Sequence, residues 1–187
     1  MKFVYVSGRQ CLDFAGTLKH RRSAREELLT DPDRLSEWAI QAGLLEADIA
    51  VTEDDLAAAT ELREAIYRVV TARLEHRPLE VADVDLLNER ASQPRLTPRL
   101  DRTGSISRDG TASQLLAGLA ADLLDLLAGG DIENVKGCAH PNCTRLYLDS
   151  SRAKNRHWCG MGTCGNKVKV QAFRARQRAA AGSLHAS

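Results

Sequence analysis

Four of the five cysteines lie in the last quarter of the chain, in two matched pairs. Cys138 and Cys143 form the first pair and Cys159 and Cys164 the second, with four residues inside each pair and fifteen between the pairs. A short gap lets one tight turn present two sulfurs to a metal ion, and two such turns complete a tetrahedral zinc site. The spacing therefore predicts one Zn2+ ion bound by these four thiolates.

Disulfide bonds are the competing interpretation of the same pairs. The start of the chain is too short for a signal peptide, so we expect a cytoplasmic protein, in which paired cysteines more often bind metal. His140 and His157 lie beside the cysteines and could replace one ligand, although four cysteines in register make this the weaker option. Four thiolates leave no open position for water, so the ion is expected to stabilise structure.

The residues around the cysteines predict a small zinc-finger fold. A short strand is expected at 146–149 and a second at 156–158, leading back to the metal. Val170 and Phe173 recur at helical spacing, so a helix is expected to begin at the last ligand. A cysteine pair, a hairpin, a second pair and a helix, in this order, are typical of a treble-clef-like finger.

Charge is divided unevenly along the chain. From residue 136 to the end there are ten Lys and Arg and one acid, whereas residues 1–135 hold sixteen bases and twenty-four acids, and the net charge of +1 hides this division. An anionic partner for the C-terminal part follows, unless the basic finger docks on its own acidic domain. The candidate nucleic-acid-binding residues are Arg145, Arg152, Lys154, Arg156, Asn166, Lys167, Lys169, Arg174, Arg176 and Arg178.

Two nucleic-acid partners are compatible with these residues. Lys and Arg on a helix fixed at a metal site can contact DNA phosphates and base edges, and Asn166 either bonds a base or caps that helix. Basic fingers of this kind also clamp structured RNA, so an RNA- or ribosome-associated module is the alternative. Few aromatic residues are present to stack on single strands. We expect DNA.

Catalysis is a third possibility, and the residues argue against it. A nuclease built on the finger would need a His, Asp or Glu pair on the helix for a second ion, and residues 165–181 contain none. A zinc deaminase needs a His-x-Glu element before its cysteines, which is also missing. We therefore expect a binding protein and no enzyme.

The rest of the chain predicts helices. Apolar side chains recur at helical spacing in four stretches, three of which follow a capping residue: Asp31, Thr52 and Thr111. Pro78 and Pro94 bound the remaining stretch. The predicted helices span about 32–42, 53–74, 81–91 and 112–128.

The fold class is therefore mainly α with small β elements (α+β). We expect a helical N-terminal domain over residues 1–130 and the zinc finger over 131–187. Within the first, a short strand is predicted at 3–6 and a hairpin or exposed loop at 96–108. The leucine-rich last helix belongs in the core or pairs with a second copy in a homodimer. No apolar run is long enough to span a membrane.

A polar cluster is expected near the N-terminus. Asp13 and Thr17 are one helical turn apart and close to several arginines, among them Arg22. A buried carboxylate bonded to a hydroxyl and a guanidinium is expected there. It either fixes the N-terminus against the helices or forms part of a small-molecule sensor site.

The sequence resembles the CGNR zinc finger proteins, which carry an N-terminal ABATE domain. The resemblance implies a bacterial transcription regulator linked to stress responses. Two positions depart from the family pattern: Lys167 replaces its arginine, losing a planar two-pronged donor, and Gly16 replaces an asparagine. The resemblance covers nearly the whole chain and rests on the two cysteine pairs, Leu148, Asp149, Ser151, Arg152, Arg156, His157, Trp158, Met161, Gly165, Asn166, residues 11–17, Trp38 and residues 43–45.

Overall fold

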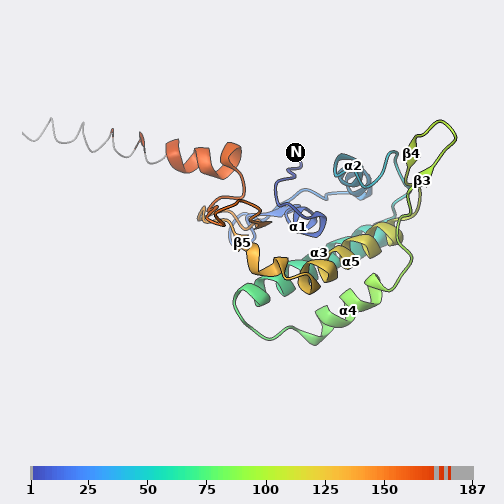
Figure 1. Ribbon diagram of the computed structural model, residues 1–187, viewed down its shortest axis with the longest axis horizontal. Coiled ribbons are helices and arrows are strands. Elements are labelled where there is room, and N and C mark those ends of the chain that lie inside the picture. Colours follow the sequence, from blue (N-terminus) through green and yellow to red (C-terminus); the bar gives the residue numbers. More distant parts are fainter. Residues whose placement is uncertain (1, 171–172, 175–176, 178–187) are drawn as a thin grey trace, which may run out of the picture.

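A computed structural model describes residues 2–170, 173–174 and 177 (Figure 1). Its helices are α1 (Gln10–Ala15), α2 (Pro32–Gln41), α3 (Glu53–Leu74), α4 (Val81–Ala91) and α5 (Ala112–Ala128). Three antiparallel pairs of short strands accompany them: β1 (Leu18–Lys19) with β2 (Glu26–Glu27), β3 (Arg99–Leu100) with β4 (Ile106–Ser107), and β5 (Val135–Gly137) with β6 (Leu146–Leu148). The predicted class, mainly α with small β elements, is confirmed.

Side-chain caps fix where three helices begin. Asp31 accepts a hydrogen bond from the Arg34 amide at the start of α2, and Pro32 occupies the first turn. Thr52 and Thr111 each form a reciprocal capping box that opens α3 and α5. These bonds satisfy amide groups that have no partner inside the helix. The helix starts predicted at the three caps are confirmed.

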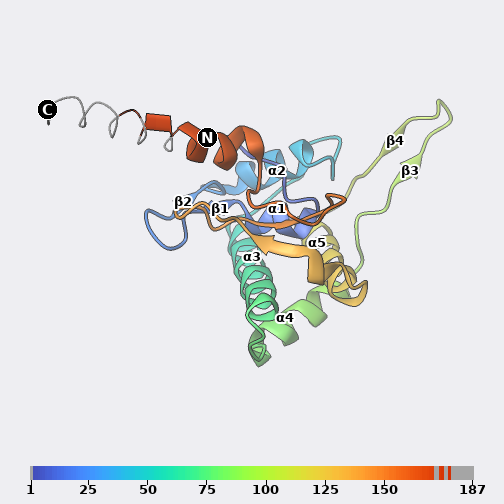
Figure 2. The ribbon, with the colours of Figure 1, turned by 60° about the vertical axis from the view of Figure 1, so that its left-hand side comes forward.

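The core lies between α1, α3, α4 and α5, and both views place α3 beside α5 (Figures 1 and 2). Leu115, Leu119 and Leu123 of α5 are buried against the other helices. The Phe14 ring packs on Trp38 with ring centroids 5.0 Å apart. The apolar face of α5 is therefore covered within one chain, as expected for a helix that belongs to the core.

Two predicted strands are wrong. Residues 3–6 form no strand, because the amides of Val6 and Ser7 donate to the Asp13 carboxylate instead of to a neighbouring strand. Residues 156–158 also form no strand, since the Arg156 amide donates to Asp149. The partner of β6 is instead β5, which lies before the first cysteine and was not predicted.

The C-terminal region shares its core with the helices. Val135 of β5 and Leu146 of β6 are buried in the same apolar cluster as Phe14, and β6 contacts α1. The Leu148 amide also donates to the Ser7 carbonyl at 2.7 Å. The expected boundary near residue 130 coincides with a turn at Gly130, whose φ is +75°, but the apolar core continues across it.

Candidate metal centre and nucleic-acid surface

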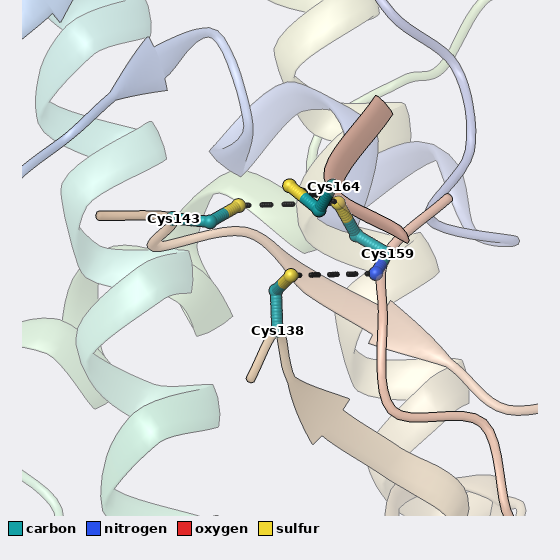
Figure 3. Close-up of side chains that lie close together, drawn as sticks. All are labelled: Cys138, Cys143, Cys159 and Cys164. Carbon is teal, nitrogen blue, oxygen red and sulfur yellow. Dashed lines mark hydrogen bonds between the residues drawn. The ribbon is translucent and has the colours of Figure 1, made fainter. Parts of the chain in front are cut away.

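The four predicted ligands converge on one point (Figure 3). Their sulfur atoms all lie within 4.8 Å of one another, with 3.9 Å from Cys143 to Cys159 and 3.6 Å from Cys159 to Cys164. A zinc ion with bonds of about 2.3 Å needs tetrahedral sulfurs roughly 3.8 Å apart. A disulfide needs about 2.05 Å, and all four thiols are free. The geometry fits a structural zinc ion, and none of these four sulfurs is bridged to another.

Two tight turns present the sulfurs. Cys138 follows β5, and the Cys143 amide donates to the His140 carbonyl at 2.9 Å to close the first turn. The Cys159 amide donates to the Cys138 sulfur at 3.4 Å, which ties the second pair to the first. Cys164 lies in a π-helical turn, Met161–Gly165, and residues 166–170 continue as α-helix. A helix therefore begins at the last ligand.

The sulfurs also show why a cation belongs there. A hydrogen bond from Cys143 lowers the pKa of Cys159 to about 5. Burial and the charge of Cys159 raise the pKa of Cys164 to about 12. One thiolate therefore opposes the ionisation of its neighbours, and a divalent ion held by all four relieves that repulsion.

The two histidines are not part of the sulfur cluster. Among the described residues, the only group of potential metal ligands consists of the four cysteines. The His157 side chain is exposed, and its carbonyl accepts a bond from the Ala139 amide at 3.0 Å. His140 accepts at Nδ1 from the Asn142 amide at 3.3 Å and borders a cavity of about 230 Å³ beside the sulfurs.

Asp149, the single acid between residue 136 and the end of the chain, is fully buried. Its carboxylate accepts bonds from the Lys136 ammonium at 2.8 Å, the Ser151 amide and hydroxyl, and the Arg156 amide. The bond from Lys136 is the main reason that the pKa of Asp149 lies far below its usual value. Asp149 thus organises the loop between β6 and the second cysteine pair. In the sequence, the signal for this role was that Asp149 is the only acid among ten bases from residue 136 to the end.

Two of the predicted nucleic-acid-binding arginines are hydrogen-bonded to groups within the protein. The buried Arg145 guanidinium donates to the carbonyl oxygens of Val4 and Gly16 at 3.0 and 3.3 Å and lies 3.5 Å from the Asp13 carboxylate. Arg156 stacks 4.4 Å from the centre of the Tyr147 ring and donates to main-chain carbonyls. Neither guanidinium is presented to a partner, because each is bonded within the fold.

The remaining described candidates are exposed. Lys154, in a left-handed turn with φ of +48°, donates to the Asp149 carbonyl at 2.9 Å. Asn166 lies on the first helical turn after the π-helix. Arg176 and Arg178 lie outside the described residues. We use the name finger cations for the exposed bases Arg152, Lys154, Lys167, Lys169 and Arg174.

The three residues predicted as a polar cluster are separated. Asp13 accepts from the Val6 and Ser7 amides at 3.0 Å and pairs with Arg145. Thr17 accepts instead from Arg63, at 3.3 Å. The Arg22 side chain is exposed on the protein surface. Burial raises the pKa of Asp13 even though the bonds from Ser7 and the charge of Arg145 oppose the shift.

A helical domain whose core continues into the β5–β6 pair, followed by a four-cysteine cluster, defines a zinc-finger protein with an N-terminal helical module. Residues 8–130 match the family model ABATE, described as "Putative stress-induced transcription regulator". Residues 134–177 match the CGNR zinc finger. The chain belongs to the ABATE family and carries a C-terminal CGNR zinc finger. No curated protein matches the chain. None of the described helices is both long and apolar enough to cross a membrane.

Proposed function

We propose that this protein is a transcription regulator that binds duplex DNA through the finger cations. One observation carries the proposal: from residue 136 onward the chain has a single acidic side chain, Asp149, which is buried, whereas five of its bases are exposed. In the described part of the chain from residue 136 onward, the surface therefore presents positive charge and no exposed acidic side chain. Such a surface attracts the phosphate backbone, which supplies most of the sequence-independent affinity of DNA-binding proteins.

The alternative that the basic finger serves to dock on its own acidic domain receives little support. The finger meets the helical domain through apolar residues, hydrogen bonds and one ion pair, Arg145 with Asp13. In the described part of the chain, none of the finger cations forms an ion pair with a carboxylate of the helical domain. Their charge is therefore available to an external anion.

The zinc ion would give this surface its shape. With four thiolates it would hold both cysteine turns and fix the start of the helix that carries Lys167 and Lys169. A fixed helix loses less conformational entropy on binding than a mobile one. For the helical domain we propose a role in sensing or dimerisation, and the shared core connects it physically to the finger.

The test uses the full-length protein and fluorescence anisotropy with one labelled duplex of DNA and one of RNA, from 50 to 200 mM KCl. If all five finger cations neutralise phosphates, the slope of log K against log salt is about −4.5. Replacing Lys167 and Lys169 with Ala should make this slope less steep by about 1.8. Arg99 and Arg102 are exposed on the β3–β4 hairpin, so R99A/R102A is the matched control.

Three results would decide the question. An unchanged slope in K167A/K169A would remove the finger helix from the interface. An equal loss in R99A/R102A would show that general charge, not the finger, drives binding. Tighter binding to the RNA duplex than to the DNA duplex would favour the RNA-associated alternative.

A further inference from the structure

A loop of the helical domain lies directly against the zinc finger. Residues 20–25 connect β1 to β2, and we call them the basic loop. His20 Nδ1 bonds to the Asn142 carbonyl, and the Arg21 amide donates to the Thr144 hydroxyl at 3.3 Å. His20 and Lys167 also line the same cavity. Figure 2 shows the loop projecting on the same side of the molecule as the finger helix.

The basic loop is held in one conformation. His20 and Arg25 both adopt the left-handed region, with φ of +51° and +44°, which residues other than glycine rarely occupy. The amides of Ser23 and Arg25 donate to the His20 carbonyl at 2.9 and 3.1 Å, closing the turn. A conformation of this kind persists only where surrounding contacts enforce it. The loop therefore presents its side chains from a fixed backbone.

The arginines of the loop have opposite orientations. Arg21 points inward, where it donates to the Ala15 and Leu18 carbonyls, pairs with Glu64 at 3.1 Å and stacks 4.0 Å from the Tyr67 ring centre. Arg22 and Arg25 are exposed, and neither forms an ion pair within the described residues. Arg21 therefore anchors the loop, whereas Arg22 and Arg25 face solvent.

The acids nearest the loop are already neutralised. Glu26 pairs with Lys19 at 2.9 Å, and Glu27 pairs with Arg63 at 2.6 Å. The helical part of the chain holds more acids than bases, with twenty-four against sixteen over residues 1–135. The basic loop is thus a positive region on an acidic domain, and it occurs where that domain meets the basic finger.

From these contacts we infer that Arg22 and Arg25 form a second phosphate-binding element, which extends the DNA surface from the finger onto the helical domain. The inference rests on the proposed function and adds residues that the family finger does not contain. A duplex contacting Lys167 meets the basic loop across the shared cavity. Because guanidinium groups donate in a planar fork, these arginines suit the bidentate recognition of phosphate.

The test compares R22Q/R25Q with K167A/K169A and R99A/R102A in the full-length protein, on the same DNA duplex and over the same salt range. Gln keeps most of the side-chain length and removes the charge. We expect R22Q/R25Q to make the salt slope less steep by about 1.8, to weaken binding equally across sequences, and to retain zinc and melting temperature. R99A/R102A should behave as wild type.

The outcomes separate this inference from the proposed function. If wild-type protein binds DNA and K167A/K169A weakens the salt dependence while R22Q/R25Q leaves it unchanged, the basic loop is not in the interface and the inference is overturned. If wild-type protein shows no salt-dependent DNA binding, the proposed function fails, and the inference fails with it. As a second variant, R22E/R25E should weaken binding more than R22Q/R25Q, since it places carboxylates against the phosphates.

Discussion

The guanidinium of Arg145 lies so close to Gly16 that a Cβ atom on Gly16 would come within 2.3 Å of Arg145 Nη1. Gly16 lies at the end of α1 and Arg145 immediately precedes β6, so this contact joins the helical domain to the finger. The φ of Gly16 is −74°, an ordinary value for any residue. The glycine is needed there for space and not for backbone freedom. An asparagine, usual in the family that the sequence resembles, would require the guanidinium to move.

Gly16→Ala should lower the free energy of unfolding by about 1–3 kcal/mol, because the guanidinium it displaces is bonded to Val4 and Asp13. Gly118→Ala is the matched control, since no atom lies within 4 Å of an added Cβ in the middle of α5. There alanine should stabilise the protein by about 0.5–1 kcal/mol. Urea denaturation measures both, and equal effects would contradict the packing argument.

Arg145→Met should destabilise the protein by about 3 kcal/mol at pH 7, since it leaves the Asp13 carboxylate buried without its cation. Adding Asp13→Asn should recover part of the loss. Burial already raises the pKa of Asp13, so this carboxylate binds its proton more tightly in the folded protein than in the unfolded chain. Stability therefore falls as pH rises from about 3.8 through the folded pKa, and the fall should be larger in R145M. Urea titrations at several pH values provide the measurement.

Asp149→Asn should loosen the loop that the carboxylate holds through Lys136, Ser151 and Arg156. The depressed pKa of Asp149 means that its stabilisation is present above about pH 3.8 and is lost as pH falls further. Wild type should thus exceed D149N in stability at pH 7, with a difference that shrinks below pH 3.8. Faster hydrogen exchange at the Ser151 and Arg156 amides of D149N would locate the effect. Unchanged exchange would contradict it.

Removing a metal ligand should damage the whole protein and not the finger alone. We expect one zinc per chain, and Cys143→Ser should lose it to a chelator far more readily than wild type does. Cys11→Ala is the control, because Cys11 is buried in the helical core away from the four sulfurs. Elemental analysis and thermal melts measure both properties. A full equivalent of zinc retained in C143S under chelation would exclude the proposed ligand set.

The metal cluster and the main helices could be predicted because their causes are local. Four cysteines in two matched pairs need only two turns to meet, and Thr52 and Thr111 cap helices through residues three positions away. The apolar period of residues 112–128 likewise indicated a helix without any knowledge of its partners.

The errors arose where distant segments determine the structure. Residues 3–6 have the composition of a strand, yet Asp13 and Arg145 bond their main chain. Arg145 and Arg156 were predicted as DNA contacts from their charge, and charge does not indicate which arginines are bonded within the fold. Arg22 was assigned to an inner cluster, whereas Arg21 points inward and Arg22 outward. Sequence spacing does not resolve the direction of neighbouring side chains in a loop.

The continuous core has a practical consequence for anyone wishing to transplant this finger. A fragment beginning at residue 131 would carry Val135 and Leu146 without the helical-domain side chains of the same apolar cluster, and would lose the anchor that Asp13 gives to Arg145. Zinc alone would then have to compensate for exposed apolar surface.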